Sequence, residues 1–457
     1  ISECLVGSEM CIRDSSKTML TKNDTRYIIR KEFFGGIVWD SIHKDYYMIS
    51  LGDFYKIENE GKLEKGDLSI NNNYRLTPYN VRDGYPGFPL RVHLALSEKC
   101  NTKCNHCFFT QIYSLGRKGG EPISTPEIKS LIDEMNDHGC MELFIGGGEP
   151  FMRSDWFEVF TYANDKGIQL YIFTNGIAVN EEIISKLNSL GNIGYLSVSM
   201  EGADKKAYSL LRQGAFWNPL ITNLQLLGEY ANFPVYVRYT ATSINIDQFN
   251  EIVNLVTEIG RGRIGIKVRP ILPAGNAVKN KNLLIDYKEY LVFLLNIKNK
   301  INSTIDIDLS VHKDANPRNK FYRFSKKTIG ISRFIPVYTG FGGSGGYTSV
   351  YIDPFGNIQD CVMTYGRFES RSVDNIRNNG LLYQWDNANP IISKRDLAGN
   401  SECYSCEYYI WCRGGCRARA VYSYQDINAK DPWCFKDLAE KCTKEELEQL
   451  LSGLNEG

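Results

Sequence analysis

From Arg91 onward the sequence alternates between short apolar segments and amphipathic segments, and this alternation limits the fold more than any other feature. Each apolar segment is bounded by polar or glycine residues, as buried strands are. One amphipathic segment has clear helix ends, with Thr125 as the expected N-cap, Pro126 next and Gly139 at the stop. Six strand–helix units in about 180 residues fit six-eighths of a (β/α)8 barrel, which needs about 250 residues. The sequence therefore predicts an α/β fold, a partial (β/α)6 TIM-type barrel. The expected strands are residues 91–97, 142–145, 169–173, 195–199, 235–240 and 264–268.

Directly after the first expected strand stands Cys100-Asn-Thr-Lys-Cys104-Asn-His-Cys107. Three thiolates at this spacing can close around one face of a metal cluster, but they cannot complete a shell of four ligands. Structural zinc takes four closed ligands, whereas an iron–sulfur cluster held by three Cys leaves one iron open to a small molecule. His106 lies directly beside Cys107 and is interpreted as a loop residue rather than as a fourth ligand. Cys100, Cys104 and Cys107 are the predicted metal ligands.

The ends of later strands carry further candidate site residues, and chemistry in such barrels sits at the carboxyl ends of the strands. Gly146-Gly-Gly-Glu-Pro150 follows the second strand, and Thr174-Asn175-Gly176 ends the third. Ser199-Met-Glu201-Gly202 ends the fourth, and Arg212 follows it. Leu272-Pro-Ala-Gly275 closes the sixth unit. Glycines let backbone groups approach a ligand closely, and a carboxylate can pair with an ammonium group.

Together, the Cys-x3-Cys-x2-Cys loop and the Gly-Gly-Glu-Pro loop one unit later resemble the radical S-adenosylmethionine (SAM) enzymes. The resemblance implies a [4Fe-4S] cluster whose open iron is chelated by SAM. One electron then cleaves SAM to a 5′-deoxyadenosyl radical, which abstracts a hydrogen atom from a substrate carbon. The family's Ser-x-Asp-Gly motif has Glu201 here in place of Asp. Residues implied to contact SAM are Gly147, Gly148, Glu149, Thr174, Asn175, Ser199, Glu201, Arg212 and Leu272.

A second group of Cys stands near the C-terminus, as Cys403-x2-Cys406-x5-Cys412-x3-Cys416 with Cys434 beyond it. With the upstream turn Asp353-Pro-Phe-Gly356 and Cys361, this region resembles the SPASM domain, which carries auxiliary iron–sulfur clusters in peptide-maturing radical SAM enzymes. The resemblance implies one auxiliary [4Fe-4S] cluster on Cys403, Cys406, Cys412 and Cys434. Cys361 and Cys416 would belong to a second.

The second auxiliary cluster lacks one expected ligand. The family has another Cys about 14 residues before the turn glycine, where this chain has Gly342 and Gly343. That cluster is therefore absent, differently ligated or open to a substrate, and the sequence leaves these alternatives open.

Residues 19–86 are polar and aromatic, with short strands expected around 26–33, 37–40 and 46–49. Placed before the barrel, this α+β segment resembles the winged-helix-like domains that capture a leader peptide by strand addition. A purely structural extension is the alternative. Residues 1–18 look like translated adapter sequence, so we expect a non-native or disordered leader there. The expected domains are residues 1–18, 19–86, 87–310 for the barrel and 311–457 for the SPASM region.

The amino-acid composition limits the kinds of partner that the protein can bind and the compartment in which it works. The 53 basic and 53 acidic residues balance, and no basic stripe points to a nucleic acid. No apolar run is long enough for a bilayer and no secretory signal pattern is present, so we expect no membrane partner. The 13 Cys are concentrated in clusters with short spacings, which indicates metal ligation in a reducing, cytoplasmic compartment.

The family resemblance implies a peptide-modifying oxidoreductase that acts on a ribosomally synthesised precursor peptide with a leader. Its one-electron reductant would be of flavodoxin or ferredoxin type. One alternative is a sulfatase-type formylglycine maturase, disfavoured because Val362 follows Cys361 where that branch has an Asp base. A non-catalytic iron–sulfur or zinc protein is the other, and it has no use for the Gly-Gly-Glu-Pro loop or Arg212. The sequence names neither the bond formed nor a catalytic base.

Overall fold

The structure is a computed structural model of the whole chain. It describes residues 25–32, 35–77, 86–109, 121–213, 216–300, 305–308, 328–329, 348–361, 375–387, 401–406, 414–434 and 437. The expected leader at 1–18, the Gly342–Gly343 zone, Val362 and Cys412 lie outside these residues.

A nine-stranded sheet forms the centre of the molecule, with the order β15-β14-β13-β11-β10-β9-β7-β17-β18. Six of its strands are parallel and lie side by side in chain order, as a partial barrel requires. All six predicted strands are present, and the fold class is confirmed. They are β7 (Arg91–Ser97), β9 (Glu142–Gly147), β10 (Gln169–Thr174), β11 (Ile193–Ser199), β13 (Val235–Ala241) and β14 (Ile264–Pro270).

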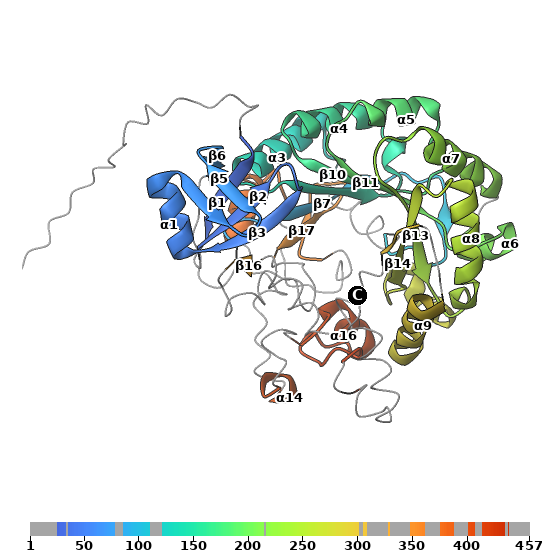
Figure 1. The fold of residues 1–457 in the computed structure, drawn as a ribbon. Helices are drawn as coiled ribbons and strands as arrows, with labels where there is room; N and C mark the ends of the chain where they lie inside the picture. Colours follow the sequence, from blue (N-terminus) through green and yellow to red (C-terminus); the bar gives the residue numbers. More distant parts are fainter. Residues whose placement is uncertain are drawn as a thin grey trace, which may run out of the picture.

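Helices cover the outer side of this arched sheet (Figure 1). Strand residues that face outward, such as Val237 and Tyr239, are fully buried against helical residues that include Phe249. The helices are α3 (Thr125–Asp137), α4 (Trp156–Asp165), α5 (Glu181–Asn188), α6 (Lys205–Leu211), α7 (Trp217–Tyr230), α8 (Phe249–Ile259) and α9 (Tyr287–Lys300). Short turns are η2 (Pro150–Met152), η3 (Ile246–Gln248), η4 (Gly275–Val278) and η5 (Lys281–Leu283).

The N-cap predicted for α3 was wrong by one residue. Ser124 is the N-cap, and its backbone N–H and hydroxyl both donate to the carboxylate of Glu127. This capping box needs an acidic residue three positions after the cap, and Glu127 stands at that distance from Ser124 rather than from Thr125.

Both edges of the central sheet are extended by strands from later in the chain. β15 (Ile307–Asp308) joins β14, and β17 (Ser349–Ile352) pairs in parallel with β7. A turn then leads to β18 (Ile358–Gln359), which pairs antiparallel with β17. The helices described after β18 are α13 (Gly380–Asn387), α14 (Ser401–Tyr404) and α16 (Arg417–Tyr424). In Figure 1, α16 lies across the open side of the arch, opposite the outer helices.

A smaller sheet precedes the barrel, with the order β16-β3-β2-β1-β6. Its antiparallel centre is followed by a helix and a hairpin, and its apolar core, which includes Ile29, Phe54 and Ile70, is separate from that of the barrel. Its elements are β1 (Tyr27–Glu32), β2 (Gly35–Asp40), β3 (Asp45–Ser50), α1 (Leu51–Glu60), β4 (Lys62–Lys65), β5 (Leu68–Asn71), β6 (Tyr74–Leu76) and β16 (Thr328–Ile329).

Buried polar contacts attach the smaller sheet to the barrel. The Arg30 guanidinium pairs with Glu32 and donates to the carbonyls of His138 and Phe88, each at 2.9 Å. The Tyr46 hydroxyl donates to Leu90 O at 3.0 Å and accepts from Met141 N–H at 2.8 Å. Because one member of each contact is buried, the small sheet is held in a fixed place beside the starts of β7 and β9.

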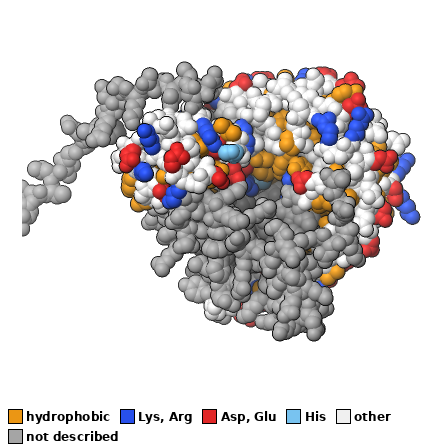
Figure 2. Space-filling model, viewed as in Figure 1, with side chains coloured by type: hydrophobic (Ala, Val, Ile, Leu, Met, Phe, Trp, Pro, Cys, Tyr) orange, Lys and Arg blue, Asp and Glu red, His pale blue; other side chains and the backbone are white. Residues whose placement is uncertain are grey.

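The surface shown in Figure 2 carries charges of both signs, scattered over the small sheet and the barrel. Hydrophobic side chains gather near the middle of this face, between these two parts of the molecule (Figure 2). Among the helices of the described residues, none has both the length and the apolar character needed to cross a membrane.

Candidate active site

The loop after β7 brings the three predicted Cys ligands into one site. β8 (Lys103–Cys104) pairs antiparallel with β12 (Arg212–Gln213), which sets Cys104 opposite Arg212. The Thr102 hydroxyl lies 3.3 Å from Cys100 Sγ and 3.7 Å from Cys104 Sγ. Burial raises the pKa of the Cys104 thiol. Burial, together with the charge of the neighbouring Cys104, raises the pKa of the Cys107 thiol to about 12.

Donor groups face these sulfurs. Arg212 Nη1 lies 3.4 Å from Cys104 Sγ, and Asn175 Nδ2 lies 3.9 Å from Cys100 Sγ. Within the described part of the chain, no three Cys, His, Asp or Glu side chains meet at a point that suits a single metal ion. Burial disfavours the thiolate form, and bound iron supplies the positive charge that reverses this preference. Three Cys on one loop, with donors aimed at their sulfurs, fit an iron–sulfur cluster that has one open iron.

The loop after β14 supports the Cys loop from the other side. Asn276 donates from its backbone N–H to Cys107 O at 2.9 Å and from Nδ2 to Cys104 O at 3.0 Å. Asn280 Nδ2 donates to Asn105 O at 2.9 Å. Gly275 has φ +57°, and a Cβ there would collide with the Cys107 carbonyl. Sequence reasoning missed both asparagines, although their place after the sixth strand was an available signal.

The glycine-rich loop after β9 is tied directly to the loop after β7. The N–H groups of Gly148 and Glu149 donate to Ser97 O and Lys99 O, at 2.8 and 2.7 Å. Gly147 has φ +110°, and a Cβ there would come within 2.8 Å of Ser97 O. A glycine is therefore required where the two loops approach each other.

Glu149 is fully buried beneath this loop. Its carboxylate accepts from Thr174 Oγ1 at 2.7 Å and from Asn175 N–H at 2.8 Å. Burial raises its pKa to about 7, against the lowering effect of these hydrogen bonds. The sequence suggested that this carboxylate pairs with the SAM ammonium group. In the structure its two oxygens fix the end of β10 against the loop after β9, and the pairing with SAM stays a prediction.

Glu201, Arg212 and His106 form a second buried cluster. The Arg212 Nε and Nη2 atoms lie 2.5 and 3.1 Å from the two Glu201 oxygens. His106 Nε2 lies 3.6 Å from Glu201 Oε1. Burial opposes ionisation of Glu201, but the adjacent Arg212 cation holds the pKa of this carboxyl far below its usual range. His106 was interpreted only as a loop residue, and its contact with Glu201 was missed.

The other predicted site residues lie around these clusters. Ser199 is the half-buried last residue of β11. Leu272 packs against Ala274 and Ala418, as does Phe108, which directly follows Cys107. Cys361 and Cys416 belong to the same small packing group as Leu272. Cys403 is close enough to Cys406 and Cys434 that their charges act on its pKa, which burial raises. The described C-terminal Cys residues thus have two sets of contacts, one for Cys361 and Cys416 and one for Cys403, Cys406 and Cys434.

The sequence of the barrel decides the family. The model of the radical SAM superfamily matches residues 94–256, a segment that begins in β7 and includes the three Cys. Residues 94–256 therefore form a radical SAM domain. This radical SAM enzyme is 27% identical over 356 residues to the AdoMet-dependent heme synthase of Methanosarcina barkeri, covering 76% of this chain and 96% of that protein. It is 22% identical over 362 residues to the mycofactocin maturase MftC of Mycolicibacterium smegmatis, covering 76% of this chain and 82% of MftC.

Solved structures show the same fold. SuiB of Streptococcus suis, bound to S-adenosylmethionine, superposes on the radical SAM enzyme with a TM-score of 0.68 at 17% identity, covering 90% of this chain and 98% of SuiB. SuiB bound to its precursor peptide SuiA gives a TM-score of 0.65 at 18% identity, with 89% and 97% coverage. The predicted resemblance to the radical SAM/SPASM peptide maturases is confirmed, and the non-catalytic alternative is set aside.

Proposed function

We propose that this radical SAM enzyme modifies a ribosomally synthesised precursor peptide, which it recognises through its N-terminal sheet. The observation that carries the proposal is the edge of β3. Within this chain β16 adds to that edge in parallel, opposite Met48 and Ile49, so the edge accepts an extended segment, and a leader strand that binds there would replace β16. Main-chain hydrogen bonds at such an edge give affinity, and neighbouring side-chain pockets give selectivity. The peptide bound in the SuiA complex of SuiB supports the same class of substrate.

The chain's own residues would hold the reacting group. Cys100, Cys104 and Cys107 would ligate a [4Fe-4S] cluster, and the strand ends at Gly147, Gly148, Ser199 and Leu272 would face SAM. When bound, this pair supplies hydrogen-atom abstraction from an unactivated carbon. Glu149 holds Thr174 and Asn175 in place at the end of β10. The barrel wall excludes water from the radical's surroundings.

We assign the auxiliary cluster to Cys403, Cys406, Cys412 and Cys434, with Cys361 and Cys416 left to an incomplete second site. The grouping of the described C-terminal Cys supports this division. No disulfide joins any of the nine described Cys, which supports a reducing, cytoplasmic compartment. A flavodoxin- or ferredoxin-type reductant is proposed from the family resemblance alone. Residues 19–86, 87–310 and 311–457 are proposed as the recognition, barrel and SPASM domains.

A test combines turnover with hydrogen exchange. The anaerobic, reduced enzyme is incubated with SAM and the precursor peptide encoded beside it, and mass spectrometry follows 5′-deoxyadenosine and the peptide. We expect a peptide mass change that the Cys100→Ala variant does not produce. Adding the peptide should also slow amide exchange in β3 but not in the β4–β5 hairpin. If the peptide is modified but amide exchange in β3 is unchanged, the N-terminal sheet does not recognise the peptide.

Tetrapyrrole modification is a second candidate, favoured by the heme synthase relative, of which this chain covers 96%. The same assay with iron coproporphyrin III distinguishes the two. A mass change in the porphyrin but not in the peptide would transfer the proposal to this substrate class.

A further inference from the structure

The inner face of the barrel carries a continuous row of aromatic rings. Strand residues alternate between the two faces of a sheet, so the neighbours of the buried, helix-facing residues point into the barrel. Successive ring centroids lie 4.8, 4.4, 4.9 and 5.7 Å apart. The row is His93, Phe144, Tyr171, Tyr195 and Tyr236, and Phe173 lies beside it, 6.0 Å from Phe144.

Three cationic side chains lie on the last two barrel strands of this face. In the β13–β14 register, Arg238 is opposite Lys267, and Thr240 is opposite Arg269. The Arg238 guanidinium lies 5.2 Å from the Phe173 ring centroid. Lys267 Nζ lies 4.1 Å from the Tyr236 ring and 4.4 Å from the Tyr195 ring. The cations therefore border the aromatic row.

Within the described residues, neither Arg238 nor Arg269 has a carboxylate at ion-pair distance. Arg269 Nη1 donates to Val268 O. Burial, followed by the positive charge of Arg269, lowers the pKa of Arg238 to about 10. Two like charges held together in a partly buried site repel each other until an anion joins them.

The carboxylates nearest this face already have partners. Glu201 is held by Arg212 and by Thr240 Oγ1, 3.3 Å away. Asp306 accepts from the Tyr236 hydroxyl at 2.7 Å. Glu142 is paired with Arg91 at 3.1 Å. No described carboxylate thus lies at ion-pair distance from the two arginines, and the charge of Glu201 acts on Arg238 less than that of Arg269 does.

We propose that Arg238, Lys267 and Arg269 bind a substrate carboxylate, carried beside a flat or aromatic group that lies against Phe173, Tyr195 and Tyr236. The proposal rests on the proposed function and deepens it, because it names the substrate chemistry of the same site. Ser199, a predicted SAM contact at the end of β11, pairs in register with Arg238. The three cations and the aromatic row therefore lie beside the predicted SAM contacts. A peptide side chain, a peptide C-terminus and a porphyrin side chain all present this chemistry.

The test measures binding without SAM or reductant, so its failure is distinct from failure of peptide modification. N-acetyl-tyrosine, N-acetyl-tyrosine amide and coproporphyrin III are each titrated into the anaerobic full-length enzyme. We expect the acid to bind about tenfold or more tightly than the amide, which corresponds to about 1.4 kcal/mol or more, because the amide lacks the charge-assisted contact. Arg238→Gln should remove that difference, and Arg238→Lys should restore part of it. Lys186→Gln, on the outer surface of α5, is the charge-matched control and should change nothing.

Several outcomes would overturn the proposal. They are equal affinity for acid and amide, unchanged acid binding in a folded Arg238→Gln variant, and no binding of any probe. Loss of acid binding when S-adenosylhomocysteine saturates the enzyme would assign the cations to the cofactor carboxylate instead. Retained binding with an Arg238-dependent preference for coproporphyrin III, rather than N-acetyl-tyrosine, would identify the porphyrin as the carboxylate source.

Discussion

At the scale of single residues, Glu149 shows how a site motif also supports the fold. Its fully buried carboxylate accepts hydrogen bonds from Thr174 and Asn175, which end the next strand of the barrel. The hydrogen bonds favour the charged form, but the burial cost is larger, and the pKa rises to about 7. The motif therefore places a carboxyl group that titrates near neutral pH at the junction of two strands.

This raised pKa predicts a pH-dependent stability. Between the ordinary value of 4.5 and about 7, folded Glu149 keeps a proton that the unfolded chain releases, so its contribution falls as pH rises. The fall approaches about 3 kcal/mol across that window at 1.36 kcal/mol per pH unit. Urea unfolding of the SAM-free protein between about pH 5 and pH 8 should show the wild type losing stability relative to Glu149→Gln. Glu182→Gln, at an exposed position, is the control and should show no such trend. If the difference in unfolding free energy between the wild type and Glu149→Gln did not change with pH, the raised pKa of Glu149 would be contradicted.

Sequence motifs predicted the candidate site residues but not all the contacts that the structure gives them. The Cys spacing and the glycine-rich loop depend on local order in the chain, so Cys100 and Glu149 were predictable. The contact of Glu201 with Arg212 and His106 depends on the short pairing of β8 with β12, which brings segments about 100 residues apart together. No local period signals a two-residue strand, so this ion pair could not be predicted.

At the scale of elements, the six barrel strands were predicted from their apolar pattern and from the polar or glycine residues that bound them. Each strand has several alternating or continuous apolar residues. The strands at the sheet edges were harder. β17 lies beside β7, although about 250 residues separate them, and β15 contains only two residues. Their positions follow from long-range pairing rather than from local pattern.

The turn after β14 gives a sharp prediction at this scale. Ala at position 275 would collide with the Cys107 carbonyl and with Phe108, and would displace Asn276 from the Cys loop. We expect Gly275→Ala to lower the iron retained per chain and to weaken the cluster's electron paramagnetic resonance signal, while the barrel stays folded by circular dichroism.

Gly262→Ala is the matched control for this prediction. Gly262 also has a positive φ, of +72°, but its Cβ would meet nothing within 4 Å. Both variants incur the backbone cost of an L-residue in this region, about 1 to 2 kcal/mol. Equal iron content in the two variants would show that the contact of the turn with the Cys loop does not support the cluster.

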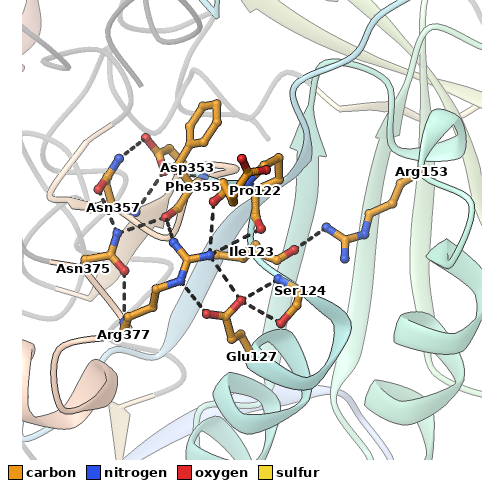
Figure 3. Close-up of polar contacts among 11 residues, drawn as sticks. Pro122, Ile123, Ser124, Glu127, Arg153, Asp353, Phe355, Asn357, Asn375 and Arg377 are labelled. Carbon is orange, nitrogen blue, oxygen red and sulfur yellow. Dashed lines mark hydrogen bonds and ion pairs between the residues drawn. The ribbon is translucent and has the colours of Figure 1, made fainter. Parts of the chain in front are cut away.

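At the scale of the whole molecule, Arg377 joins segments far apart in the chain (Figure 3). Its guanidinium pairs with Glu127 at the start of α3 and donates to Phe355 O in the β17–β18 turn at 2.8 Å. It also donates to Glu121 O at 3.1 Å and Pro122 O at 3.3 Å. Asn375 and Asp353 order the same turn through their own hydrogen bonds (Figure 3). This side chain thus adds to the pairing of β17 with β7 in attaching the C-terminal segment to the barrel.

We therefore expect Arg377→Gln to loosen the C-terminal segment without unfolding the barrel. About a third of the ion pair is exposed, so the expected loss is about 1 to 2 kcal/mol, which speeds local amide exchange about five- to thirtyfold. Hydrogen exchange read by mass spectrometry should show this in β17, the turn and α13, with β10 and β11 unchanged. Lys129→Gln is the control, because Lys129 is exposed to a similar degree as Arg377 and pairs from the same helix with Glu158 on α4, which is more exposed than Glu127. Equal exchange in the two variants, or faster exchange throughout the barrel, would show that Arg377 does not hold the two parts together.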